Sequence, residues 1–129
     1  MSRDDAKAFL TKAEQYLASA EENLAARRFT VAAGDAVHAG ISAKDGIVTA
    51  LTGATSKHQD HRAAVPELRA ALSTRGTAAS AERALKELLA AKPDIEYSAE
   101  ILTEAKAKAL VRRASSLVDT AHAVIRLGD

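Results

Sequence analysis

Residues 55–61 read TSKHQDH and bring together two of the chain's four histidines with a lysine and an aspartate. His58 and His61 are three positions apart, so on a helix both imidazoles would project to one side. Imidazole is a common zinc ligand, but structural zinc needs four ligands and catalytic zinc needs three plus water. Asp60 or the distant His38 could serve as a further ligand. The chain has no cysteine and no HExxH motif, however, so the sequence does not favour a metal site.

Two other interpretations of this stretch stay open. In the first, Ser56 or Asp60 caps the next helix and His61 fixes how that helix docks. In the second, the free N–H groups of the helix start hold a phosphate, assisted by Lys57 and a protonated histidine. We favour the structural interpretation, because such residues commonly form caps and connectors. His58 and His61 are kept as candidate ligand-binding residues.

Two more side chains are candidates for ligand binding. Lys44 stands beside Asp45 in a segment of mostly small and apolar residues. It could face a ligand, although a snorkelling lysine next to an exposed aspartate is the simpler expectation. Tyr97 could stack on a nucleotide base, or it could pack half-buried with its hydroxyl in water.

The last predicted helix has a basic edge that could meet RNA phosphates, formed by Lys106, Lys108, Arg112 and Arg113. Glu104, however, precedes Lys108 by four residues, which is the favourable order for a solvated ion pair. The solvated face is therefore the preferred interpretation. The sequence contains no nucleophile elbow and no GxxxxGK[ST] phosphate loop.

Composition sets limits on the class of protein. A chain of 129 residues is enough for one domain with a core, which we expect to span residues 1–129. The net charge of +1 predicts no general attraction to nucleic acid, and the absence of cysteine excludes disulfides and thiolate chemistry. The charged N-terminus has no apolar segment typical of a secretory signal, and no apolar run approaches the ~20 residues of a membrane span. We expect a cytoplasmic protein with no membrane contact.

The spacing of apolar residues is helical almost throughout and favours no strand. It predicts an all-α fold, an antiparallel up-and-down bundle of four to five helices. Apolar stripes that include Tyr16 and Val31 are expected to face the core. The expected helices cover about 4–27, 30–51, 56 or 60 to before 76, 80 to before 93, and 104–127. Their expected caps are Ser2, Gly53, Ser80, Thr103 and Gly128.

Three glycines lie inside the second predicted helix. Gly34, Gly40 and Gly46 are spaced by six residues and so do not share one helix face. Each is unfavourable in a helix relative to alanine. We expect a close backbone approach by a neighbouring helix to explain at least one of them.

Three segments of the chain resemble the HEPN superfamily of small helical-bundle domains. AGDAVHAGISAKDGIVTALTG is similar to that family's alanine-rich second helix, with Lys44 in the lysine position. HRAAVPELRAAL is similar to its third helix, which His61 would open. KPDIEYSAEILTEAKAKALVRRA is similar to its tyrosine-containing connector and last helix, with Tyr97 in the tyrosine position.

The resemblance implies a bundle of four to five helices that is commonly a homodimer. Some members of the superfamily are metal-independent ribonucleases, often toxins paired with a nucleotidyltransferase antitoxin, whereas others bind nucleotides or act as non-catalytic partners. The ribonucleases carry an arginine followed within a turn or two by a histidine. The nearest pairs here, Arg28 with His38 and Arg113 with His122, are spaced too widely for that motif.

We therefore expect a non-catalytic interaction or nucleotide-binding module that needs no cofactor. Its candidate ligand-binding residues are Lys44, His58, His61 and Tyr97. Its candidate partners are a second copy of the chain, a nucleotidyltransferase in a toxin–antitoxin-type pair, and a nucleotide or RNA. The alternative is a metal-independent ribonuclease that uses Arg113 and His122 as an atypical pair.

Overall fold

The computed structural model describes residues 2–55 and 61–128, and within these ranges the chain is helical with no strand. A 3₁₀ turn, η1, precedes the third α-helix. The elements are α1 (Ser2–Ala25), α2 (Phe29–Thr52), η1 (His61–Ala63), α3 (Ala64–Leu72), α4 (Ala78–Glu96) and α5 (Glu104–Arg126). The expected all-α bundle is confirmed.

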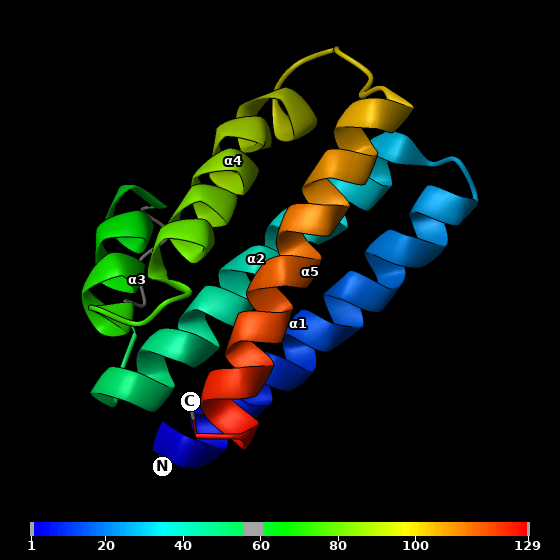
Figure 1. The fold of residues 1–129 in the computed structure, drawn as a ribbon. Helices are drawn as coiled ribbons and strands as arrows, with labels where there is room; N and C mark the ends of the chain where they lie inside the picture. The colour runs from blue at the N-terminus through cyan, green and yellow to red at the C-terminus, as the bar shows by residue number, and fades with distance from the viewer. Residues whose placement is uncertain (1, 56–60, 129) are drawn as a thin grey trace.

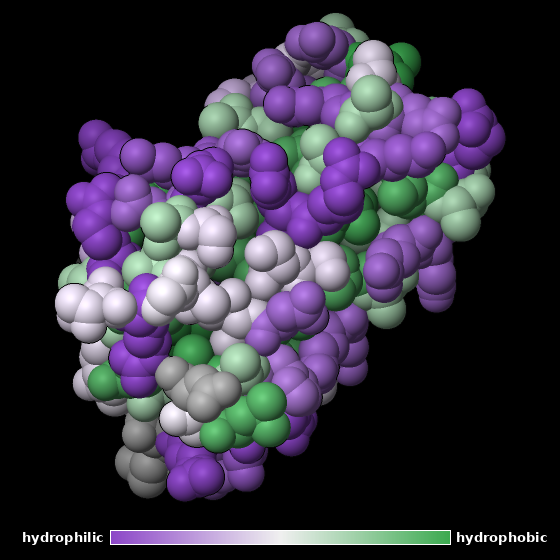
Figure 2. Space-filling model, in the orientation of Figure 1, coloured by the Kyte–Doolittle hydropathy of each residue, from purple (hydrophilic) through white to green (hydrophobic). Residues whose placement is uncertain are grey.

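Four long helices run alternately in opposite directions, and the short α3 lies to one side of them (Figure 1). α2 packs against each of the other helices. Both chain termini lie at one end of the bundle, which we call the terminus end. The other end holds the α1–α2 turn and the α4–α5 connector, and we call it the connector end. Hydrophilic side chains cover much of the face drawn in Figure 2, over α4 and the first part of α5.

A single cluster of buried apolar residues draws on all five helices. Alanines are its commonest members, and larger side chains such as Leu10, Ile47, Leu88 and Leu117 fill the space between them. Small residues let helix backbones approach closely. None of the described helices combines the length and the sustained hydropathy that a bilayer-spanning segment requires.

The glycines of α2 show where this approach is closest. A Cβ added at Gly40 would lie 2.5 Å from Cδ1 of Leu88, and one at Gly46 would lie 3.0 Å from Cδ1 of Ile125 and 3.4 Å from the Ala6 carbonyl oxygen. At Gly34 the nearest atom is 3.6 Å away, an ordinary contact. Side-chain packing therefore explains Gly40, and at Gly46 the backbone of α1 also lies close, as expected for at least one of the three.

Two residues placed in the buried stripes are exposed instead. Tyr16 is 38% exposed and Val31 is 51% exposed. α1 packs mainly against α2 and α5, so no other described helix covers the side of α1 that carries Tyr16. Tyr16 stacks on His38 of α2, with ring centroids 5.1 Å apart.

Three of the expected caps are confirmed. Gly128 is left-handed, with φ of 78°, just after α5. The Thr103 hydroxyl accepts a hydrogen bond from the Lys106 N–H at 3.2 Å and so caps α5. Gly53 adopts a left-handed conformation after α2, with φ of 94°, and its N–H donates to the Thr49 carbonyl.

Other expected helix bounds were wrong. Ser2 and Ser80 lie inside α1 and α4 and do not precede them. α4 also continues past Pro93 to Glu96. A proline removes one helical hydrogen bond, and near a helix end that loss is small. The Tyr97 N–H donates to the Pro93 carbonyl at 2.9 Å and completes the final turn.

The start of the third helix lies only partly within the described residues. Ser56 and Asp60, its expected caps, lie outside the described residues. α3 begins at Ala64, so Pro66 falls in its first turn. A proline is tolerated there, because first-turn N–H groups have no partner within the helix.

Candidate functional site

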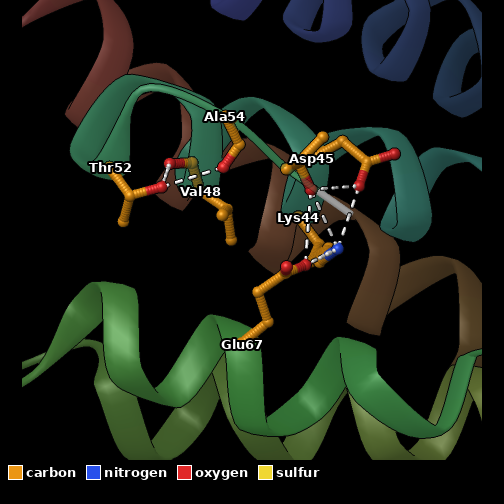
Figure 3. A network of polar contacts seen from close by, with 7 residues as sticks. Lys44, Asp45, Val48, Thr52, Ala54 and Glu67 are labelled. Carbon is orange, nitrogen blue, oxygen red and sulfur yellow. Dashed lines mark hydrogen bonds and ion pairs between the residues drawn. The ribbon is translucent and has the colours of Figure 1, made fainter. Parts of the chain in front are cut away.

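Lys44 is the only charged side chain buried in the described part of the chain, with 4% of its surface exposed. Its Nζ lies 3.1 Å from Oδ1 of the adjacent Asp45 and donates to the Thr55 hydroxyl at 3.0 Å. It also forms an ion pair with Glu67, which reaches across from α3 (Figure 3). These contacts hold α3 against the C-terminal half of α2.

Thr55 also contacts both carboxylates of this network. The Thr55 hydroxyl lies 2.9 Å from Asp45 Oδ1 and 3.4 Å from Glu67 Oε1. Two carboxylates thus lie within reach of the one buried ammonium. A buried charge is stable only when it is paired in this way.

This arrangement corrects the expected exposure of both charged residues. Lys44 does not snorkel to water, and Asp45 keeps only 20% of its side-chain surface exposed. The ammonium is engaged by partners from α2, α3 and the segment that follows α2. Its geometry is that of a structural ion pair between helices.

The other candidate ligand residues do not join Lys44. His58 and the side chain of His61 lie outside the described residues. Tyr97 follows α4 at the connector end and is 80% exposed, which contradicts the half-buried packing considered for it. Lys44 is fifteen residues into α2 from that end, roughly 22 Å along the helix axis. Lys44 and Tyr97 therefore do not form one site.

The alternative ribonuclease pair is also separated. Arg113 and His122 are nine residues apart on α5, which places them about half a turn from each other around the helix and roughly 13 Å apart along it. Arg113 Nε lies 2.5 Å from Glu87 Oε2 on α4. Within one copy of the chain, this arginine and histidine do not converge.

The basic edge of α5 is partly neutralised by Glu104. Lys108 Nζ lies 3.1 Å from Glu104 Oε2, and Arg27 approaches the other carboxylate oxygen at 3.3 Å. The hydrogen bond from Lys108, with the charges of Lys108 and Arg27, lowers the pKa of Glu104 below its ordinary value. The solvated ion pair expected at this edge is confirmed. The described residues also hold no cluster of three or more metal-ligating side chains.

The described surface has an apolar groove at the connector end that the sequence did not indicate. Its volume is about 520 Å³, and its walls are the α1–α2 turn, the start of α2 and the α4–α5 connector. Val31 and Ile101 line it and are 51% and 82% exposed. A second hollow of about 340 Å³ shares Thr30, Val31 and Ile95 with it and extends toward His38. We call the two together the connector-end groove.

Several contacts fix the walls of this groove. The Leu102 N–H donates to the Thr30 hydroxyl at 3.2 Å and ties the α4–α5 connector to α2. Arg27 has a left-handed backbone with φ of 64°, and the Arg28 N–H bonds the Asn23 carbonyl at 2.9 Å, a Schellman ending for α1. The Arg27 guanidinium lies 5.0 Å from the centre of the Phe29 ring. Contacts within the chain itself therefore hold the walls of the groove in place.

Charges surround the apolar floor. Arg28 Nε donates to Asn23 Oδ1 at 2.7 Å, and Asn23 with Ser19 bonds Asp35 on α2. Arg28 has no carboxylate partner among the described residues, so its charge is available at the rim. At the α4 side, Lys92 and Glu96 form an ion pair at 2.9 Å, and this contact lowers the pKa of Glu96.

No protein-family model matches the chain, and no curated protein matches it either. The likeness to the HEPN superfamily therefore rests on the sequence patterns quoted above.

Sequence reasoning missed the connector-end groove because its residues come from separate elements. A weak signal was present in Ile101, a large aliphatic residue in a connector where no helix stripe could bury it. Val31 gave no signal, because its spacing matches the buried stripe of α2. Val31 is a surface residue because none of the described helices covers it.

Proposed function

We propose that this protein is a non-catalytic, HEPN-like interaction module that binds a partner protein through the connector-end groove. The observation that carries the proposal is the pair Val31 and Ile101, two largely exposed aliphatic side chains that line one preformed groove. Exposed apolar groups that share a concave surface are typical of protein interaction sites.

The chemistry of the rim indicates the kind of partner. The apolar floor suits an amphipathic helix, which would lay its apolar face between Val31 and Ile101. The free charge of Arg28 favours a carboxylate on that helix. Exposed Tyr97, next to the groove-lining Ser98, adds a side chain of the type that often anchors interfaces.

The HEPN resemblance makes a nucleotidyltransferase the first partner to examine. A second copy of this chain and a nucleotide are competing occupants, and each has its own test. Sedimentation velocity at tens of micromolar measures self-association. A thermal shift with nucleotides measures ligand binding, because a ligand of the native state raises apparent stability.

Photo-crosslinking tests the proposal directly. A photoreactive amino acid replaces Ile101 in one variant and Leu127 in a control variant. Leu127 is 66% exposed but does not line the groove. The proposal predicts that position 101 captures an amphipathic segment with acidic residues, identified by mass spectrometry, and that position 127 does not.

Two outcomes would contradict the proposal. Equal capture at both positions would mean that the groove has no preference for a partner. Capture at position 101 of the same chain alone, with a dimer in sedimentation, would assign the groove to self-association.

A further inference from the structure

A second cavity lies at the terminus end, away from the connector-end groove. It has a volume of about 390 Å³ and lies between the first turns of α1 and the end of α2. Its size is within the range of small-molecule sites. The lining residues used below are Asp5, Phe9, Lys12 and Thr49.

Thr49 is a buried polar side chain without a partner. It is 3% exposed, and its hydroxyl makes no hydrogen bond with the described residues. Thr52 and Thr120, also on helices, each bond the carbonyl one turn earlier, at 2.7 Å and 3.1 Å. A buried hydroxyl that lacks such a bond is unfavourable, so a ligand that supplies the missing partner would bind favourably here.

Residues of opposite charge line the same cavity as Thr49. Asp5 and Lys12 are seven positions apart on α1, which places them on the same side of the helix two turns apart. Both are exposed, and neither pairs with a described residue. Phe9, half-buried between them, gives the cavity an apolar wall.

We propose that this cavity binds a small zwitterion whose ammonium and carboxylate are separated by several methylene groups. Its ammonium would meet Asp5, its carboxylate would meet Lys12, and the methylene chain would lie against Phe9. The Thr49 hydroxyl would bond the polar end nearest to it. Two helical turns span roughly 10.5 Å, so opposite charges at that spacing favour an ω-amino acid over an α-amino acid.

Titration calorimetry with 6-aminohexanoate as the probe tests this proposal. Hexanoate and hexylamine, which have the same chain length and one charge each, are the matched controls. We expect saturable binding of the zwitterion at least tenfold tighter than that of either control. Absence of saturable binding, or equal binding of hexanoate, would overturn the proposal.

Variants separate recognition from folding. Thr49→Val and Lys12→Gln should each weaken binding by tenfold or more, whereas Lys7→Gln, an exposed change on α1 outside the cavity, should leave it unchanged. Thr49→Val removes an unpaired hydroxyl, so without ligand this variant should melt no lower than the wild type. Wild-type affinity in Thr49→Val would show that the hydroxyl has no part in binding. Ile101→Glu, in the connector-end groove, should not affect this binding, so the two proposals fail independently.

Discussion

Glu67 on α3 forms an ion pair with the ammonium of Lys44, and that ammonium is buried on α2. The pair adds a polar contact to the apolar packing between these two helices. It also explains why a lysine occurs among the small and apolar residues of α2.

Replacing Lys44 with methionine should destabilise the protein by about 2–3 kcal/mol. Removing one partner of a buried pair commonly costs ~3–5 kcal/mol, and Asp45 and Glu67 retain some contact with water that reduces the loss. Urea denaturation measures the free energy of unfolding. Lys86→Met is the control, because Lys86 pairs with Glu82 on an exposed surface. Equal effects of the two variants would contradict a structural role for the buried ammonium.

The glycines of α2 should respond differently to alanine. Gly34→Ala should stabilise the protein by roughly 0.5–1 kcal/mol, because alanine favours the helix and its Cβ meets only an ordinary contact. Gly40→Ala should be less stable than Gly34→Ala by about 1–3 kcal/mol, because its Cβ would overlap the fully buried Leu88. Thermal unfolding of both variants provides the comparison. A stabilising effect of similar size at both positions would contradict close packing at Gly40.

The two threonines that precede α5 and α4 form a matched pair. Thr103→Ala should cost ~1 kcal/mol, because it removes the hydrogen bond to the Lys106 N–H. Thr77→Ala should change stability little, because the Thr77 side chain makes no cap hydrogen bond. Chemical denaturation measures both. The cap assignment fails if Thr77→Ala is the more damaging change.

Acid should weaken the contact between α3 and α4. Arg69 donates two hydrogen bonds to Glu82, at 2.5 Å and 2.9 Å, and this contact lowers the pKa of the Glu82 carboxyl below its ordinary 4.5. A folded-state pKa below the unfolded one contributes stability above the unfolded value. That contribution is lost as the pH falls through the folded value.

Glu82→Gln should therefore flatten the decline in unfolding free energy as the pH falls below about 4.5, since the titrating group is gone. Denaturant titrations at a series of acidic pH values measure the slope. Glu14→Gln makes the same charge change on α1, far from this contact. An identical pH dependence in the two variants would mean that the Arg69 contact is not formed in solution.

Much of the fold could be predicted from local patterns. The periodicity of apolar residues, Gly53 and Thr103 place most of the helices, because caps and stripes depend on residues close in sequence. The end of α4 could not be placed from the sequence. A proline such as Pro93 is tolerated when few helical hydrogen bonds follow it, and the sequence alone does not show how many follow. The exposure of Val31 depends on the absence of a covering helix, which no local pattern reports.

The polar sites were harder to predict for the same reason. The burial of Lys44 depends on Glu67, twenty-three positions away on another helix, so the sequence showed only a charge beside small residues. The connector-end groove combines residues from α2 and the α4–α5 connector. Tyr97 was expected to stack on a base or to pack half-buried, and its 80% exposure follows from the position where α4 ends.

The alanine-rich interior has a consequence for how this chain can evolve. Alanines make up more than half of the buried apolar residues in the described ranges. A methyl group has no alternative rotamer with which to yield to an enlarged neighbour, so added volume must displace a whole helix. Sequence drift should therefore be concentrated at the ends and rim of the bundle, where a new binding preference can arise without disturbing the packed centre.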